Sequence, residues 1–164
     1  MRKRFWYPKK KDVIENNRMV LSIVRANKSD KHRVIGDFKI DSVLKEAKRK
    51  KGDVFDKASV IVRGLNQEHP FDSANKRTAY FTGNEFICKN KGFLVLKKRS
   101  KQKQMCVKIR EGRVTDEDIS NWLRHADKDK NYGKGRWGWY IKSNHIRQST
   151  KLFVKLLSTS KKGF

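Results

Sequence analysis

The sequence predicts an all-α domain followed by a basic helical extension. Apolar residues recur at three- and four-residue spacing, turn residues separate these stretches, and no segment shows the sustained alternation of a half-buried strand. The chain has 164 residues, of which 42 are Lys or Arg and 17 are Asp or Glu, which gives a formal net charge of +25. Since 36% of the residues are hydrophobic, a chain of this length can bury one core, and a folded helical domain is expected.

The helices are predicted from apolar periodicity and from residues that start or end a helix. We expect Asp12 and Asp53 to cap the first and third helices, Gly92 to end the fourth, and Thr115 to open the last in a capping box. A short apolar run at 93–96 is predicted to be a strand or a buried link, and 97–104 a basic loop. The expected helices span residues 12–27, 37 or 41 to 51, 53–68, 75–91, 105–111 and 115–124.

The chain divides into a helical domain at residues 1–126 and a basic appendage at 127–164. The appendage is predicted to contain a Lys/Gly-rich loop and an amphipathic helix at 143–158. Two tryptophans, Trp137 and Trp139, lie beside Lys134 and Arg136, a combination that suits stacking of bases and binding of phosphates. The alternative is that these tryptophans pack the appendage onto the helical domain.

Composition also bounds the compartment and the partners. The two cysteines, Cys88 and Cys106, show no CxxC spacing, so a reducing cytoplasm is expected and a disulfide framework is not. No apolar run approaches the roughly 20 residues that cross a bilayer, and no signal peptide is evident. The positive charge predicts an anionic partner, either nucleic acid, an acidic protein or a phosphorylated ligand.

The segment at residues 69–78, HPFDSANKRT, combines groups that suit phosphoryl or nucleotidyl transfer. A helix beginning at Asn75 would offer free N–H groups and a positive dipole end to an anion, with Lys76 and Arg77 beside it. A neutral His69 across the turn can accept a proton from a hydroxyl. The alternative from spacing alone is that His69 and Asn75 end and begin two helices and that the cations are solvated.

Residues 69–77 resemble the signature of the Fic/Doc family, H-x-F-x-[DE]-[GA]-N-[GK]-R. Ala74 and Lys76 are similar to the Doc (death-on-curing) branch, whereas the Fic branch has Gly at the position of Lys76 and a second Arg where Tyr80 stands. The likeness extends over about residues 10–125. It implies a Fic/Doc-like helical bundle.

The resemblance also implies roles for individual residues. His69 would be the general base, Phe71 the anchor of the motif turn, and Asn75, Lys76 and Arg77 the ligands of the nucleotide phosphates. Doc-like proteins transfer the γ-phosphate of ATP to a hydroxyl of elongation factor Tu and are restrained by an antitoxin, while Fic proteins transfer a nucleotidyl group. The implied partners are therefore a translation protein and an acidic antitoxin.

One departure from the signature concerns Mg²⁺. The family's metal-binding acid sits two residues before the Asn, where this sequence has Ser73, and the nearest acid, Asp72, lies one residue earlier. Three interpretations stay open: the turn shifts so that Asp72 reaches the metal, Ser73 contributes through its hydroxyl, or catalysis is lost.

These observations predict a Doc-like kinase that uses ATP and Mg²⁺. The first alternative is a catalytically silent module of the same fold that binds nucleic acid or ribosomes through its charge. The second is an AMP transferase, against which Lys76 and Tyr80 argue. The remaining histidines, His32, His125 and His145, are expected at the surface or at helix ends.

Overall fold

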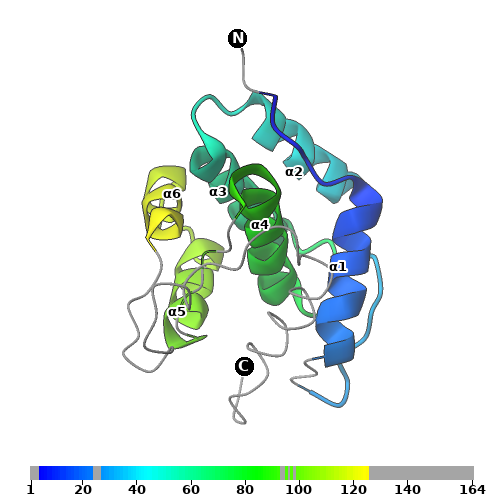
Figure 1. Ribbon diagram of the computed structural model, residues 1–164. Helices are drawn as coiled ribbons and strands as arrows, with labels where there is room; N and C mark the ends of the chain where they lie inside the picture. Colours follow the sequence, from blue (N-terminus) through cyan, green and yellow to red (C-terminus); the bar gives the residue numbers. More distant parts are fainter. Residues whose placement is uncertain (1–3, 24–26, 93–94, 96, 98, 126–164) are drawn as a thin grey trace.

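A computed structural model describes residues 4–23, 27–92, 95, 97 and 99–125 (Figure 1). Within these ranges the chain forms six helices, and the β contact is one isolated antiparallel bridge between Val34 and Phe71. The predicted all-α fold is therefore confirmed. The helices are α1 Lys10–Ile23, α2 Asp37–Arg49, α3 Val54–Glu68, α4 Asn75–Lys91, α5 Arg99–Arg110 and α6 Asp116–Arg124.

Helix α3 lies at the centre of the bundle. It packs against α2, α4, α5 and α6, while α1 packs against α4 and α2. Figure 1 shows α3 and α4 in the middle, with α1 and α2 on one side and α5 and α6 on the other. Three consecutive residues of α3, Val60, Ile61 and Val62, are fully buried, so this helix is enclosed on more than one side. The segment that follows α3 is thus anchored in the core.

The bounds of α3 and the start of α4 follow the predictions. Asp53 accepts hydrogen bonds from the N–H groups of Phe55 and Asp56, and Asp56 accepts one in return from the N–H of Asp53, so the two residues form a capping box. Helix α3 ends at Glu68, because Pro70 disfavours helical geometry at His69. Asn75 begins α4.

Two glycines allow the central helices to approach closely. A Cβ added at Gly83 of α4 would clash with the side chain of Val62 on α3, and one at Gly64 of α3 would meet Val43 of α2 at 2.6 Å. Real Cβ atoms do not approach this closely, so both contacts depend on glycine. The α3–α4 contact sets the separation of the two helices on either side of the motif turn.

Helix α6 is held on α3 by a charged cluster. The Arg124 guanidinium donates to Asp53 at 2.6 Å and to Asp56 at 3.0 Å, and the Ser120 hydroxyl donates to Asp56 at 2.7 Å. The predicted capping box of Thr115 and Asp118 opens the helix. The same two acids that cap α3 therefore also bind α6.

The expected bounds of the first two helices are partly wrong. Helix α1 begins at Lys10, so Asp12 lies in its first turn and accepts from the Lys9 N–H at 2.7 Å instead of standing before the helix. Helix α2 begins at Asp37 and ends at Arg49, before the predicted residue 51.

The predicted loop at 97–104 is wrong, because α5 begins at Arg99. The inner face of this helix consists of Gln102, Cys106 and Ile109, which recur at helical spacing and are all buried. In the sequence, the many Lys and Arg residues around them obscure this spacing. The Gln102 amide donates to the Lys97 carbonyl at 2.6 Å. A buried glutamine stands where the periodic pattern of a helix would have an apolar residue, so the sequence pattern does not indicate a helix here.

Val95 belongs to a buried link. Its carbonyl accepts from the Tyr80 hydroxyl at 2.7 Å, and its N–H donates to the Asn84 amide oxygen at 2.8 Å. Side chains of α4 thus take the hydrogen bonds that a neighbouring strand would have supplied.

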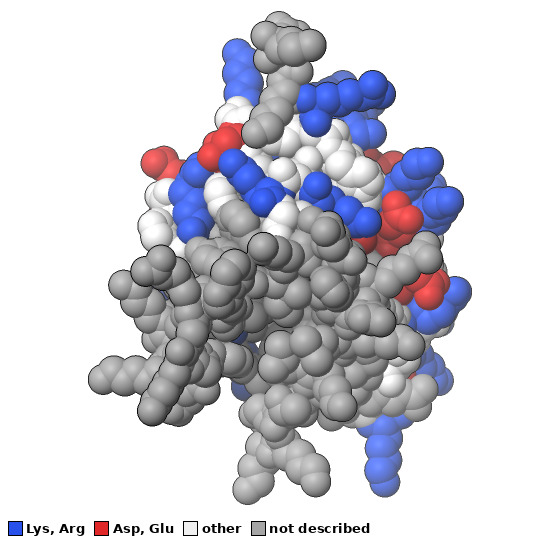
Figure 2. Space-filling view, viewed as in Figure 1, with Lys and Arg blue, Asp and Glu red and all other residues white. Residues whose placement is uncertain are grey.

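The predicted appendage at 127–164, with Trp137, Trp139, Lys134 and Arg136, lies outside the described residues. No helix in the described part is both long and apolar enough to cross a membrane. On the face shown in Figure 2, Lys and Arg cover more of the described surface than Asp and Glu.

Candidate active site

The turn between α3 and α4 carries an unusual backbone. His69 has φ 49° and Ala74 has φ 64°, and they are the two non-glycine residues with positive φ in the described ranges. Such conformations cost of order 1–3 kcal/mol each and persist only where the surroundings fix them. They cluster at functional sites in proteins, which directs attention to this turn.

Hydrogen bonds within the turn hold it closed. The Asn75 side chain accepts from the Phe71 N–H at 3.0 Å and donates to the Phe71 carbonyl at 2.7 Å. Phe71 itself is 1% exposed and packs in the core. Asn75 therefore builds the turn with its side chain, and the N–H groups at the start of α4 are the groups that could take the part in phosphate binding predicted for it.

The segment before α2 lines up along this turn. Val34 forms the isolated bridge with Phe71, the Asp72 N–H donates to the Arg33 carbonyl at 2.9 Å, and the Ile35 N–H donates to the Pro70 carbonyl at 2.9 Å. Chain far from the motif in sequence thus supports one side of the turn.

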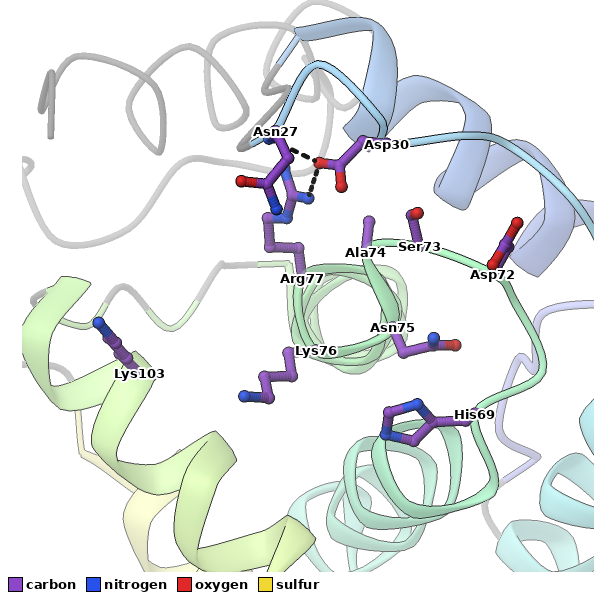
Figure 3. A pocket seen from close by; sticks show the side chains of 10 residues that line it. All are labelled: Asn27, Asp30, His69, Asp72, Ser73, Ala74, Asn75, Lys76, Arg77 and Lys103. Carbon is purple, nitrogen blue, oxygen red and sulfur yellow. Dashed lines mark hydrogen bonds and ion pairs between the residues drawn. The ribbon is translucent and has the colours of Figure 1, made fainter. Parts of the chain in front are cut away.

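A pocket of about 300 Å³ opens at the start of α4 (Figure 3). Its walls come from the motif turn, from the first turn of α4, from the segment after α1 and from α5. The lining residues are Asn27, Asp30, His69, Asp72, Ser73, Ala74, Asn75, Lys76, Arg77 and Lys103.

His69 has the electrostatics of a base. Burial lowers the pKa of its imidazole below the usual 6.5, because a half-buried ring solvates its charged form poorly. Nearby cations lower this pKa further: Arg110 on α5, Lys76 on α4 and Lys39 on α2. The imidazole is therefore neutral at pH 7 and can accept a proton.

Arg77 lies in the pocket wall but is already paired. Its guanidinium lies 3.0 Å from a carboxylate oxygen of Asp30, and the same oxygen accepts from the Asn27 N–H at 3.3 Å (Figure 3). Lys76 also lines the pocket and is half-buried. An anion at the start of α4 would meet the Lys76 charge directly and an Arg77 charge that Asp30 balances.

Asp72 and Ser73 are the two residues predicted to bind Mg²⁺. The Ser73 hydroxyl accepts from the Lys31 N–H at 3.2 Å, while Asp72 is exposed at the pocket rim. The described residues contain no group of three or more His, Cys, Asp or Glu that could hold a metal. Mg²⁺ needs only one or two carboxylates when substrate phosphates and waters complete its shell, so Asp72 fits it better than Ser73.

Comparison with known families adds one finding. Residues 13–87 match the model of the Fic/DOC family. The match runs from α1 into α4 and includes the turn and the start of α4 that line the pocket, whereas α5 and α6 lie beyond it. It covers somewhat less than half of the chain and does not distinguish the Doc branch. No curated protein matches the chain.

The pocket contains residues that the Fic/DOC motif does not predict. Asn27, Asp30 and Lys103 line it, and Arg110 acts on His69, although none has a spacing in sequence that marks it. Asn27 and Asp30 come from a polar segment, Lys103 from the part of α5 predicted to be a loop, and Arg110 from the part of α5 predicted to be a short helix. Only the folded arrangement brings them to the motif.

Other candidates have simpler roles. His125 ends α6 and its Nδ1 lies 3.1 Å from the Asn121 carbonyl, as expected of a residue at a helix end. His32 differs from the expectation of a surface or capping residue, because it is half-buried and bonded to Asn17 of α1. Cys88 and Cys106 are unpaired and buried, and burial raises their pKa to about 11 and about 12, so neither is a thiolate near pH 7.

Proposed function

We propose that this protein transfers the γ-phosphoryl group of ATP to a hydroxyl of a translation protein, as Doc-like toxins do. The observation that supports the proposal is the pocket at the start of α4, which is lined by a neutral His69 and by the Lys76 ammonium. A base for the hydroxyl and an electropositive seat for phosphates are the two parts that phosphoryl transfer requires.

In the proposed reaction His69 takes the proton of the target hydroxyl. The hydroxyl oxygen forms a bond to the γ-phosphorus, the bond to the bridging oxygen breaks, and ADP leaves. Lys76 and the N–H groups at the start of α4 would hold the phosphates in place. Mg²⁺, bound through Asp72 and the phosphates, would supply neutralisation of the phosphate charge.

The Doc branch, the elongation-factor target and restraint by an acidic antitoxin are part of the proposal. Lys76 in place of Gly, and Tyr80 in place of a second Arg, support the kinase over an AMP transferase. The net charge of +25 supports an acidic partner, and the free thiols of Cys88 and Cys106 suit the reducing cytoplasm that we propose as the site of action.

A second candidate is a catalytically silent module that binds nucleic acid or ribosomes. The pairing of Arg77 with Asp30 favours it, because a balanced Arg77 attracts phosphate less, and so does Ser73 at the position of the metal-binding acid. The charge of the whole chain would then be its means of binding.

One experiment separates these candidates. The purified protein is incubated with a translation-competent lysate and ATP labelled at the α- or the γ-phosphate. Protein labelling from γ alone supports the kinase, and labelling from α supports the AMP transferase. Labelling from neither, with His69→Ala indistinguishable from the wild type, supports the binding module.

A further inference from the structure

A buried asparagine outside the motif connects α1 to both ends of the start of α4. Asn17 is fully buried, and its side-chain amide donates to the Ser73 carbonyl at 2.9 Å and to the Thr78 hydroxyl at 3.0 Å. One acceptor precedes the first turn of α4 and the other follows it. A single side chain thus spans the N–H groups proposed to bind phosphate.

His32 fixes the orientation of this amide. The amide nitrogen has two hydrogens, and Ser73 and Thr78 accept one each, so the amide oxygen faces the His32 Nδ1 at 2.7 Å. The imidazole must therefore donate from Nδ1. All three partners of Asn17 constrain its rotamer.

The start of α4 needs such support. Ala74, the residue before the helix, is left-handed and has no side chain that can cap the helix. The bonds of Asn75 to Phe71 close the turn from within, but they involve neither the Ser73 carbonyl nor the Thr78 side chain. Asn17 holds that part from α1.

We propose that Asn17 is a positioning residue for the anion site at the start of α4, with His32 as the group that orients it. The proposal rests on the proposed function for the identity of the anion, a nucleotide phosphate. Its structural content, that Asn17 sets the geometry of residues 74–77, stands apart from that identity.

The chain supplies a matched control. Asn16, the preceding residue, is 5% exposed and also bonds α1 to α4, through the Thr82 hydroxyl at 3.2 Å and the Glu85 carboxylate at 2.7 Å. Asn16→Leu removes amide bonds between the same two helices, but one turn further from the motif. Both Asn16→Leu and Asn17→Leu therefore remove a buried amide between α1 and α4. They differ in the hydrogen-bond partners that the amide loses, which lie next to the motif only for Asn17.

The test compares amide NMR shifts and ATP affinity in the full chain. Asn17→Leu should shift the amides of residues 74–77 and weaken ATP binding by about ten- to a hundredfold, the loss seen when a residue that orients metal ligands is removed. Asn16→Leu should leave both as in the wild type. Equal effects of the two variants on these amides would overturn the proposal.

Variants of His32 keep the test decisive if Asn17→Leu does not fold. His32→Leu should shift the same amides, and His32→Asn, which places an N–H where Nδ1 stands, should restore them. Unchanged amides in His32→Leu would count against the proposal. If the wild type binds no ATP, the proposed function fails, and the amide comparison still decides the role of Asn17.

Discussion

The Arg77 guanidinium lies 3.0 Å from the Asp30 carboxylate, and the two side chains are 8% and 10% exposed. The pair joins the segment after α1 to the first turn of α4, inside the pocket wall. A buried ion pair contributes most through the penalty for breaking it, since the remaining charge stays buried without its partner. The pair therefore fixes the pocket wall, and Asp30 also weakens the attraction of the Arg77 charge for a phosphate.

Asp30→Asn should separate these two effects. The variant keeps the size of the side chain but removes the Asp30 charge from the buried Arg77 guanidinium, so the free energy of unfolding should fall by about 3 kcal/mol. The affinity for ATP should rise at the same time. Urea denaturation and calorimetric titration measure the two quantities. Asp72→Asn, which removes an exposed pocket carboxylate, is the matched control and should leave the urea midpoint unchanged; an equal shift in both variants would refute the role of the pair.

The pKa of His69 predicts the acidic limb of activity. Because the imidazole acts as a base only when neutral, and its folded-state pKa lies below 6.5, kcat/KM should rise with pH through a midpoint below 6.5. The same shift makes stability fall as pH drops below 6.5, because the unfolded chain then binds the proton more readily than the folded one.

Arg110 provides the test of this electrostatic account. Arg110→Gln removes the positive charge that lowers the pKa of His69 most and should raise that pKa toward 6.5, while burial, Lys76 and Lys39 stay as they are. Titration of the His69 ring protons by NMR measures the change without any substrate. Lys108→Gln removes an exposed charge from the same helix and should have a smaller effect. An equal change of the His69 pKa in both variants would show that this pKa depends only on the net charge of the protein and not on Arg110 in particular.

Exchanging alanine and glycine at positions 74 and 112 tests the cost of the left-handed backbone conformation. Both have positive φ, 64° and 67°, and nothing lies within 4 Å of a Cβ built at Gly112. Ala74→Gly should raise the free energy of unfolding by about 0.5–1 kcal/mol, since relief of the left-handed strain exceeds the entropy that glycine adds to the unfolded chain. Gly112→Ala should lower it by about 1 kcal/mol. Thermal unfolding of both variants checks the signs, and a loss of stability in Ala74→Gly would mean that the alanine methyl packs in a way that outweighs the strain.

The sequence predicts the parts of the site that are local in the chain. The Asp53 cap, the break at His69-Pro70 and the start of α4 at Asn75 all follow from residues within a few positions of the feature, so pattern and structure agree. Asp30 and Lys103 reach the pocket through contacts that depend on how α1, α4 and α5 pack, and no local pattern encodes those contacts. The role of Asn17 cannot be predicted from the sequence for the same reason, because a helical asparagine that is buried looks the same in sequence as one that is exposed.

Gly83 sets the spacing between α3 and α4, and hence between His69 and the start of α4. Gly83→Ala should lower the free energy of unfolding by about 1–2 kcal/mol, because the clash with Val62 exceeds the gain of roughly 1 kcal/mol from placing alanine in a helix. Val62→Ala alone should also destabilise, by leaving a cavity. The double variant should be more stable than the sum of the two changes predicts, since the new methyl group fills the space that valine vacates. Denaturation of all four proteins measures this coupling, and strict additivity would show that the helices separate instead of competing for one space.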